Sequence, residues 1–235
     1  MRGYIVMAMF AASLAQAESG NYTEVRDLTL QSAGLTEFVI DAGSGSLVVT
    51  GVDGVAEIMV TATIIIEDTN EKDALKLIEK RLDLQLERDG DRAELKSGFN
   101  SSWHWDGNAA IDLDVRMPAG IALNVDDGSG STTISGVMGD VLVDDGSGSI
   151  HVTNAGSVTV DDGSGSITVS AASGDVHIID GSGTIEIQGV GGSVRIEDGS
   201  GHIRVEDVEK DLIIEDDGSG GVTFSNVRGS VEQDT

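Results

Sequence analysis

The chain has 235 residues, of which 32 are glycine, one is proline and none is cysteine. Its 41 acidic and 14 basic residues give a net charge of −27. This charge disfavours nucleic acid and anionic membrane surfaces as partners, because binding to phosphate relies on Lys and Arg. The lack of cysteine excludes disulfides and thiol chemistry, so stability has to come from a packed core and backbone hydrogen bonds.

The first 17 residues have the pattern of a signal peptide. Arg2 precedes an apolar run over residues 4–14, and Ala15-Gln16-Ala17 forms a small-residue cleavage site. The run is shorter than the roughly 20 residues that a membrane-spanning helix needs, which argues against a membrane anchor. We therefore expect an exported protein, located in the periplasm, at the cell surface or in the medium, with no transmembrane segment in the mature chain. Cleavage of the signal peptide would remove Arg2 and change the net charge from −27 to −28.

Residues 18–117 precede the regular repeats and form the second predicted unit. Residues 38–52 resemble one coil of the repeat, although the next copy begins only near residue 128. Between them the pattern predicts a strand over 56–66 and an amphipathic helix over 70–82, with Leu75, Ile78 and Leu82 on one face.

A predicted hairpin follows this helix. Its strands, 82–87 and 92–96, flank the turn signal Asp89-Gly90, and a further strand over 111–117 leads into the repeats. We expect residues 18–117 to be an N-terminal coil with a capping subdomain, since an exposed end coil would offer unpaired strand edges.

Residues 118–235 repeat one motif with a nearly fixed period. Asp-Gly-Ser-Gly occurs six times, and its first glycine falls at 128, 146, 163, 181, 199 and 218. A spacing of 17 to 19 residues is typical of a solenoid, in which each repeat buries its apolar face by stacking on its neighbours. This third unit is therefore the predicted repetitive β-solenoid.

Each period contains two short strands. Branched apolar residues alternate with other residues in both halves, as in Val158-Thr159-Val160 and Ile167-Thr168-Val169. Coils stacked about 4.8 Å apart would form two parallel sheets that face each other across a narrow core. The predicted fold class is all-β, a parallel β-solenoid (β-helix) of about 18-residue coils.

The two corners of each coil differ. One is Asp-Gly-Ser-Gly, and the other carries a small or apolar residue that we expect to point inward and close the end of the core. These residues are Val137, Ala155, Ala172, Val190, Val208 and Val227. Glycines are expected to supply the positive φ angles of the corners.

The order and period of these motifs carry a resemblance to a known family. The leader, the strand-and-helix unit, Met117-Pro118-Ala119-Gly120 and the Asp-Gly-Ser-Gly-Ser-Ile-x-Val coils resemble the bacterial putative-adhesin family of exported β-solenoid proteins, a domain of unknown function. The resemblance covers residues 24–232. It implies a cell-envelope or surface protein with an adhesive or structural, non-catalytic role, and it brings no catalytic residues.

Aspartates that precede the repeated glycines are the candidate metal ligands. They would place one carboxylate on each coil: Asp127, Asp145, Asp162, Asp180, Asp198 and Asp217. Two unit charges ~5 Å apart repel by only about 1 kcal/mol in water, so an exposed ladder is stable without metal. Each side chain is expected to accept the backbone N–H two residues on and thereby fix its own turn.

Calcium-binding nonapeptide repeats place an aspartate where this chain has isoleucine, for example Ile150 and Ile167. No cofactor is therefore expected. Calcium is the one ion left open, and a calcium- or cation-binding exported repeat protein is the alternative function.

Catalysis is not expected. Every corner is four or five residues long, too short to wall a cleft, and the chain has no nucleophile elbow, phosphate loop or zinc-spaced cluster. The four histidines fall in different parts of the chain and are interpreted as solvated strand residues: His104, His151, His177 and His202. The outward strand positions do not form the threonine column that ice binding requires.

Four residues remain as candidate partner contacts. Trp103 and Trp105 lie in a polar stretch, and aromatic side chains anchor protein and sugar surfaces, although packing onto the first coil is the preferred interpretation. Arg195 and Arg204 lie half a coil apart and are predicted to form a local basic patch near His202. The expected partner is a protein or glycan surface, and end-to-end self-association of the uncapped C-terminal coil stays open.

Overall fold

Strands form in both halves of each coil, as the alternation of apolar and polar residues predicts. The computed structural model describes residues 11–18, 20–100 and 108–234. In the repeats, five-residue strands alternate with longer ones, and the last strand has three residues. The strands are β9 (Val141–Asp145), β10 (Gly148–Ala155), β11 (Val158–Asp162), β12 (Gly165–Ala172), β13 (Val176–Asp180), β14 (Gly183–Val190), β15 (Val194–Asp198), β16 (Gly201–Val208), β17 (Leu212–Asp216), β18 (Gly221–Val227) and β19 (Val231–Gln233).

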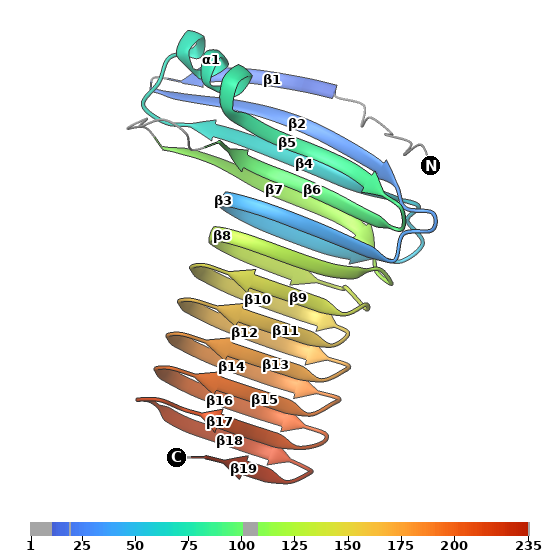
Figure 1. The fold of residues 1–235 in the computed structure, drawn as a ribbon, viewed down its shortest axis with the longest axis vertical. Coiled ribbons are helices and arrows are strands. Elements are labelled where there is room, and N and C mark those ends of the chain that lie inside the picture. The colour runs from blue at the N-terminus through green and yellow to red at the C-terminus, as the bar shows by residue number, and fades with distance from the viewer. Residues whose placement is uncertain (1–10, 19, 101–107, 235) are drawn as a thin grey trace.

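The coils stack in register and build two parallel sheets, which confirms the predicted all-β solenoid (Figure 1). Odd-numbered strands from β9 to β19 form one sheet, and even-numbered strands from β10 to β18 form the other. Each residue lies beside its equivalent one coil away, as Val160 beside Ile178 and Ile167 beside Ile185. These four side chains point inward and are buried.

Backbone hydrogen bonds continue from coil to coil around the Asp-Gly-Ser-Gly corner. The N–H of Gly163 donates to the Asp145 carbonyl at 2.9 Å, and the N–H of Gly165 donates to the Ser182 carbonyl at 3.0 Å. Gly165 has φ +152°, and a Cβ added there would lie 1.5 Å from the Gly148 carbonyl oxygen. Only glycine allows this approach of one coil to the next.

The second corner confirms the inward plugs and corrects the expectation about glycine. Five of the six plug residues are buried, and Val227 in the last coil is partly buried. The positive φ falls on the residue just before each plug, and glycine holds that place in only two coils: Gly136, Asn154, Ala171, Gly189, Asp207 and Asn226. Asn and Asp tolerate this left-handed conformation, and Ala171 adopts it as well, so glycine is not required there.

A coil near the N-terminus stacks directly on the first regular coil. β3 (Glu37–Val52) and β8 (Ala122–Ser135) each run through both sheets and pair in parallel, with Ala42 beside Asp127 and Gly45 beside Gly130. The coil predicted over residues 38–52 is therefore part of the stack. Part of the chain between these two strands continues the stack on the other side of β3.

That intervening chain and the strands before β3 extend both sheets beyond the solenoid. β6 and β7 pair in parallel with the two halves of β3, and the outer strands β5, β4, β2 and β1 add to them antiparallel. Their bounds are β1 (Ala11–Glu18), β2 (Asn21–Gln31), β4 (Glu57–Ile66), β5 (Leu82–Asp89), β6 (Arg92–Phe99) and β7 (Ala109–Pro118). β1 includes residues assigned above to the signal peptide, which stays a prediction.

The predicted helix is present as α1 (Glu71–Arg81). Asn70 caps it by accepting the N–H of Asp73 at 3.1 Å. The buried face holds Ala74 and Ile78, whereas Leu75 is 46% exposed. The assignment of Leu75 to the apolar face is wrong. A helix turns about 100° per residue, so Leu75 lies about 100° around the helix from Ala74 and outside the face that Ala74 shares with Ile78.

In the described part of the chain, no helix combines the length and the apolar character needed to cross a membrane.

Substitution of the close-contact glycine tests the stacking directly. We expect Gly165→Ala to lower the free energy of unfolding by about 2–4 kcal/mol, because its Cβ would overlap the Gly148 carbonyl oxygen. The control is Gly120→Ala, where a Cβ would meet nothing within 4 Å. Urea unfolding of both variants measures the difference, and equal midpoints would contradict the close approach.

Candidate functional site: a buried aspartate column and two outer faces

Five aspartates of the Asp-Gly-Ser-Gly corners lie beside one another in successive coils. Their strands pair so that each stands next to its equivalent above and below. All five are buried, with 1–3% of their surface exposed: Asp127, Asp145, Asp162, Asp180 and Asp198. We call Asp145, Asp162, Asp180 and Asp198 the aspartate column, with Asp127 as its first neighbour.

One oxygen of each column carboxyl fixes its own turn, as predicted. The N–H of the serine two residues later donates to Oδ1 at 2.9–3.1 Å in all four coils. This bond holds the side chain inside the corner. The prediction of a turn-fixing role is confirmed.

The expectation of an exposed ladder is wrong, and the reason is the parity of the strand. In β9, Val141 and Val143 point into the core, and Asp145 is two residues further on the same side. Alternate residues of a strand share one face, so the carboxyl enters the end of the core. The outward carboxylate of that strand is the preceding residue, Asp144. Counting from the apolar pair would have shown this from the sequence.

The second oxygen of each column carboxyl has no hydrogen-bond partner. Oδ2 is enclosed and unpaired in all four column residues. In the first coil, the Thr132 hydroxyl donates to Asp127 Oδ2 at 2.8 Å. Isoleucine replaces this threonine at the equivalent place in the next four coils, namely at Ile150, Ile167, Ile185 and Ile203.

Burial shifts the acidity of these groups. It raises the pKa of Asp145 and of Asp180 to about 6, and repulsion from neighbouring column carboxylates adds to the rise. The pKa values of Asp127, Asp162 and Asp198 are also raised, with burial again the largest cause. The bond from the serine N–H opposes the shift in the four column residues but does not overcome it.

Asp217, the sixth predicted ladder residue, lies outside the column. The last coil is one residue longer, and the pairing of β15 with β17 slips, so that Glu197 stands beside Asp216. Asp216 Oδ1 accepts the N–H of Gly218 at 2.9 Å, and Asp217 accepts from the Gln233 side chain at 2.9 Å. The extra residue shifts the carboxylates out of the inward position.

Arg195 and Arg204 do not form a basic patch. Successive half coils belong to opposite sheets, so Arg195 on β15 and Arg204 on β16 face away from each other. Each is paired with a carboxylate: Arg195 contacts Glu215, and Arg204 Nη2 lies 2.7 Å from Glu206 Oε1. The predicted patch is therefore wrong in its geometry and in its charge.

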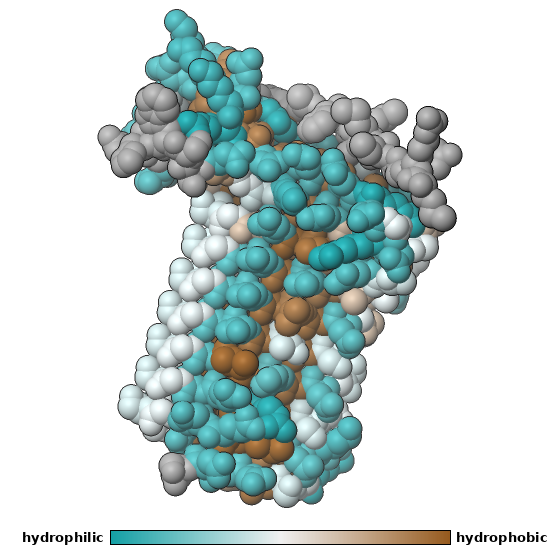
Figure 2. All heavy atoms as spheres, viewed as in Figure 1, coloured by the Kyte–Doolittle hydropathy of each residue, from teal (hydrophilic) through white to brown (hydrophobic). Residues whose placement is uncertain are grey.

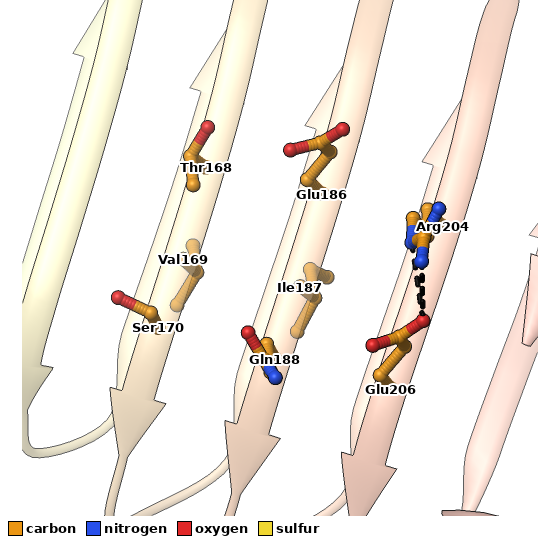
Figure 3. A pocket seen from close by; sticks show the side chains of 8 residues that line it. All are labelled: Thr168, Val169, Ser170, Glu186, Ile187, Gln188, Arg204 and Glu206. Carbon is orange, nitrogen blue, oxygen red and sulfur yellow. Dashed lines mark hydrogen bonds and ion pairs between the residues drawn. The ribbon is translucent and has the colours of Figure 1, made fainter. Parts of the chain in front are cut away.

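Arg204 instead borders a shallow hollow on the outer face of β12, β14 and β16 (Figure 3). The hollow has a volume of about 90 Å³ and is lined by Thr168, Val169, Ser170, Glu186, Ile187, Gln188, Arg204 and Glu206. Val169 and Ile187 point into the core, so the hollow presents the six polar side chains to solvent. We call this surface the β12–β16 hollow.

On the visible face, hydrophilic residues predominate, and apolar residues show between them (Figure 2). Exposed large apolar residues include Met138 and Leu142 in the first coils and Phe224 and Val231 in the last. Self-association through the C-terminal coil stays a prediction.

The remaining candidate residues have separate outcomes. His151 and His202 are exposed as predicted, whereas His177 is partly buried and its Nε2 is enclosed without a partner. Trp103, Trp105 and His104 lie outside the described residues. Within the described ranges, no three Asp, Glu or His side chains come close enough together to hold a metal ion.

No family model matches the chain, and no curated protein matches it. Solved structures resemble it, and three of them are described here. One is a "putative cell adhesion protein" from Clostridium sporogenes, 12% identical, with 90% of this chain and 100% of that chain covered at a TM-score of 0.36. A "putative adhesin" from Bacteroides fragilis is 9% identical, with 89% and 97% covered and a TM-score of 0.49. A "putative adhesin" from Parabacteroides distasonis is 15% identical, with 89% and 97% covered and a TM-score of 0.41.

The names of these three structures agree with the putative-adhesin family that the sequence resembles. Membership of the family itself stays a prediction.

Calcium is not expected to stabilise the aspartate column, since Oδ1 accepts an N–H and Oδ2 is enclosed. A ligand at 100 times its dissociation constant would raise the free energy of unfolding by roughly 2.7 kcal/mol. We expect the melting temperature in excess calcium to equal that in magnesium and in chelator at matched ionic strength. A calcium-specific rise would instead support the cation-binding alternative.

Proposed function

We propose that the protein is an exported β-solenoid of the cell envelope or cell surface with an adhesive or structural, non-catalytic role. It would bind a protein or glycan surface through the outer faces of its two sheets. The leader pattern of residues 1–17 supports export, and the high negative charge supports solubility outside the cell.

The shape of the outer faces is the observation that carries this proposal. Each sheet presents the same outward position once per coil, so side chains line up in columns along the stack. The column through the β12–β16 hollow contains His151, Thr168, Glu186, Arg204 and Thr223. A long, nearly flat and polar surface of this kind suits a partner that is itself extended, such as a glycan chain or a protein surface.

The β12–β16 hollow is the best-defined feature on these faces. It places hydroxyl, amide, carboxylate and guanidinium groups next to one another (Figure 3). Arg204 pairs with Glu206 through Nε at 3.1 Å and Nη2 at 2.7 Å, and its side chain stays 62% exposed and accessible to a partner. Such polar groups recognise hydroxyl and amide groups without an enclosing cleft.

Reversal of one charge in the hollow tests the proposal. The full chain is screened against immobilised glycans and extracellular proteins, and the best partner is then titrated with variants. We expect Arg204→Glu to weaken binding at least about tenfold, which corresponds to roughly 1.4 kcal/mol. The matched control is Arg195→Glu, because Arg195 is also paired with a glutamate but lies on the other sheet.

Binding that is unchanged in Arg204→Glu, or equally weakened in both variants, would contradict a role for the β12–β16 hollow. A screen without any partner would contradict the adhesive role.

A further inference from the structure

We propose that the aspartate column is a proton-binding column, which takes up protons in mildly acidic surroundings and thereby stabilises the stacked coils. The inference is independent of the adhesive role, because it concerns the interior of the solenoid and not its outer faces. It also differs from a metal site, since the ligand is the proton alone.

Oδ2 of each column residue is enclosed and has no hydrogen-bond partner, and in two coils it lies near a glycine of its own corner. A Cβ added to Gly165 would lie 1.5 Å from the Gly148 carbonyl oxygen and 3.3 Å from Asp162 Oδ2. Gly183 shows the same arrangement one coil further, with the Gly165 carbonyl oxygen at 1.5 Å and Asp180 Oδ2 at 3.3 Å. At both glycines a backbone carbonyl oxygen of the neighbouring coil and an unpartnered carboxylate oxygen therefore border the place of the missing side chain. A proton on Oδ2 removes the buried charge and turns an oxygen that can only accept into one that can donate.

The charges that act on the column are all negative. Asp127 and Asp144 raise the pKa of Asp145, and Asp161 raises that of Asp162. Asp145 and Asp180 are also repelled by the column carboxylate of a neighbouring coil. At the last rung, Asp216 and Asp217 act on Asp198. The position equivalent to Thr132, whose hydroxyl donates to Asp127, is isoleucine in the coil of each column residue. The hydrogen bond from the serine N–H to Oδ1 is the one interaction given above that favours the ionised form of the column carboxyls.

The direction of the pH effect follows from the raised pKa values. A carboxyl whose pKa is higher in the folded state than in the unfolded chain binds protons more tightly when folded. Its stabilising contribution is complete below the unfolded pKa near 4 and is lost as the pH rises through the folded value, which is about 6 for Asp145 and Asp180. The solenoid should therefore be more stable at pH 5 than at pH 7.5.

Thr132 provides an internal comparison. Its hydroxyl gives Asp127 Oδ2 the donor that the four column residues lack. Ile167→Thr should supply the same donor to Asp162, because Ile167 occupies the equivalent place. This substitution should lower the pKa of Asp162 and leave Asp198, two coils away, unchanged.

Thermal unfolding of the full chain between pH 5 and pH 7.5, at constant ionic strength, measures the effect. We expect the melting temperature of the wild type to be higher at pH 5 by about 5 °C. Asp145→Asn/Asp162→Asn should remove about half of this difference, because an amide at each place is neutral at both pH values. Asp144→Asn/Asp161→Asn is the matched control, since it removes the same charge from the outward, exposed positions of the same strands. It should keep most of the difference, because burial and not repulsion from Asp144 or Asp161 is the largest cause of the raised pKa of Asp145 and Asp162.

Equal pH profiles for the two double variants would overturn the proposal, because the effect would then come from overall charge. A titration of the wild-type aspartate carboxyl carbons by NMR keeps the test independent of whether the variants fold. Midpoints near 6 for Asp145 and Asp180 support the column. Midpoints near 4, the ordinary value for aspartate, would overturn it.

Discussion

The approach of one coil's backbone to the next at the Asp-Gly-Ser-Gly corner constrains the rest of the structure. At Gly165 and Gly183 the neighbouring carbonyl oxygen occupies the place where any other residue would carry its Cβ. This contact, together with hydrogen bonds from coil to coil, keeps equivalent residues side by side in all the regular coils. Register then decides which side chains enter the core and which form the outer columns.

The same constraint explains why carboxylates are buried in a protein with so little basic charge. A tight corner needs an acceptor for the serine N–H inside the turn, and the aspartate supplies it through Oδ1. The strand parity that places this acceptor correctly also encloses Oδ2, where it has no partner. Burial of an unpaired charge is costly, so protonation is the natural way to relieve it. Turn chemistry and proton binding are thus two consequences of one inward-pointing residue.

The sequence predicts the architecture well because the repeat is local and regular. The period gives the coils, the alternation gives the two sheets, and Asn70 and Asp89-Gly90 mark the helix and the hairpin. The candidate sites were harder to predict, since they depend on spatial relations between half coils. Arg195 and Arg204 are close in sequence but lie on opposite sheets, and the single extra residue before Asp217 removes it from the column. The hollow on β12–β16 has no motif of its own and emerges only from the stacking.

The register of the stack is tested most directly by thermal unfolding of two deletion variants, followed by circular dichroism. Deletion of residues 163–180 removes one whole coil and joins Asp162 to Gly181, so every remaining coil keeps its register. The account predicts a β-rich protein that unfolds cooperatively at a somewhat lower temperature, as expected for a shorter stack. Deletion of residues 163–171 removes half a coil and should abolish the cooperative transition. Equal stability of the two variants, or loss of folding in the first alone, would contradict the account.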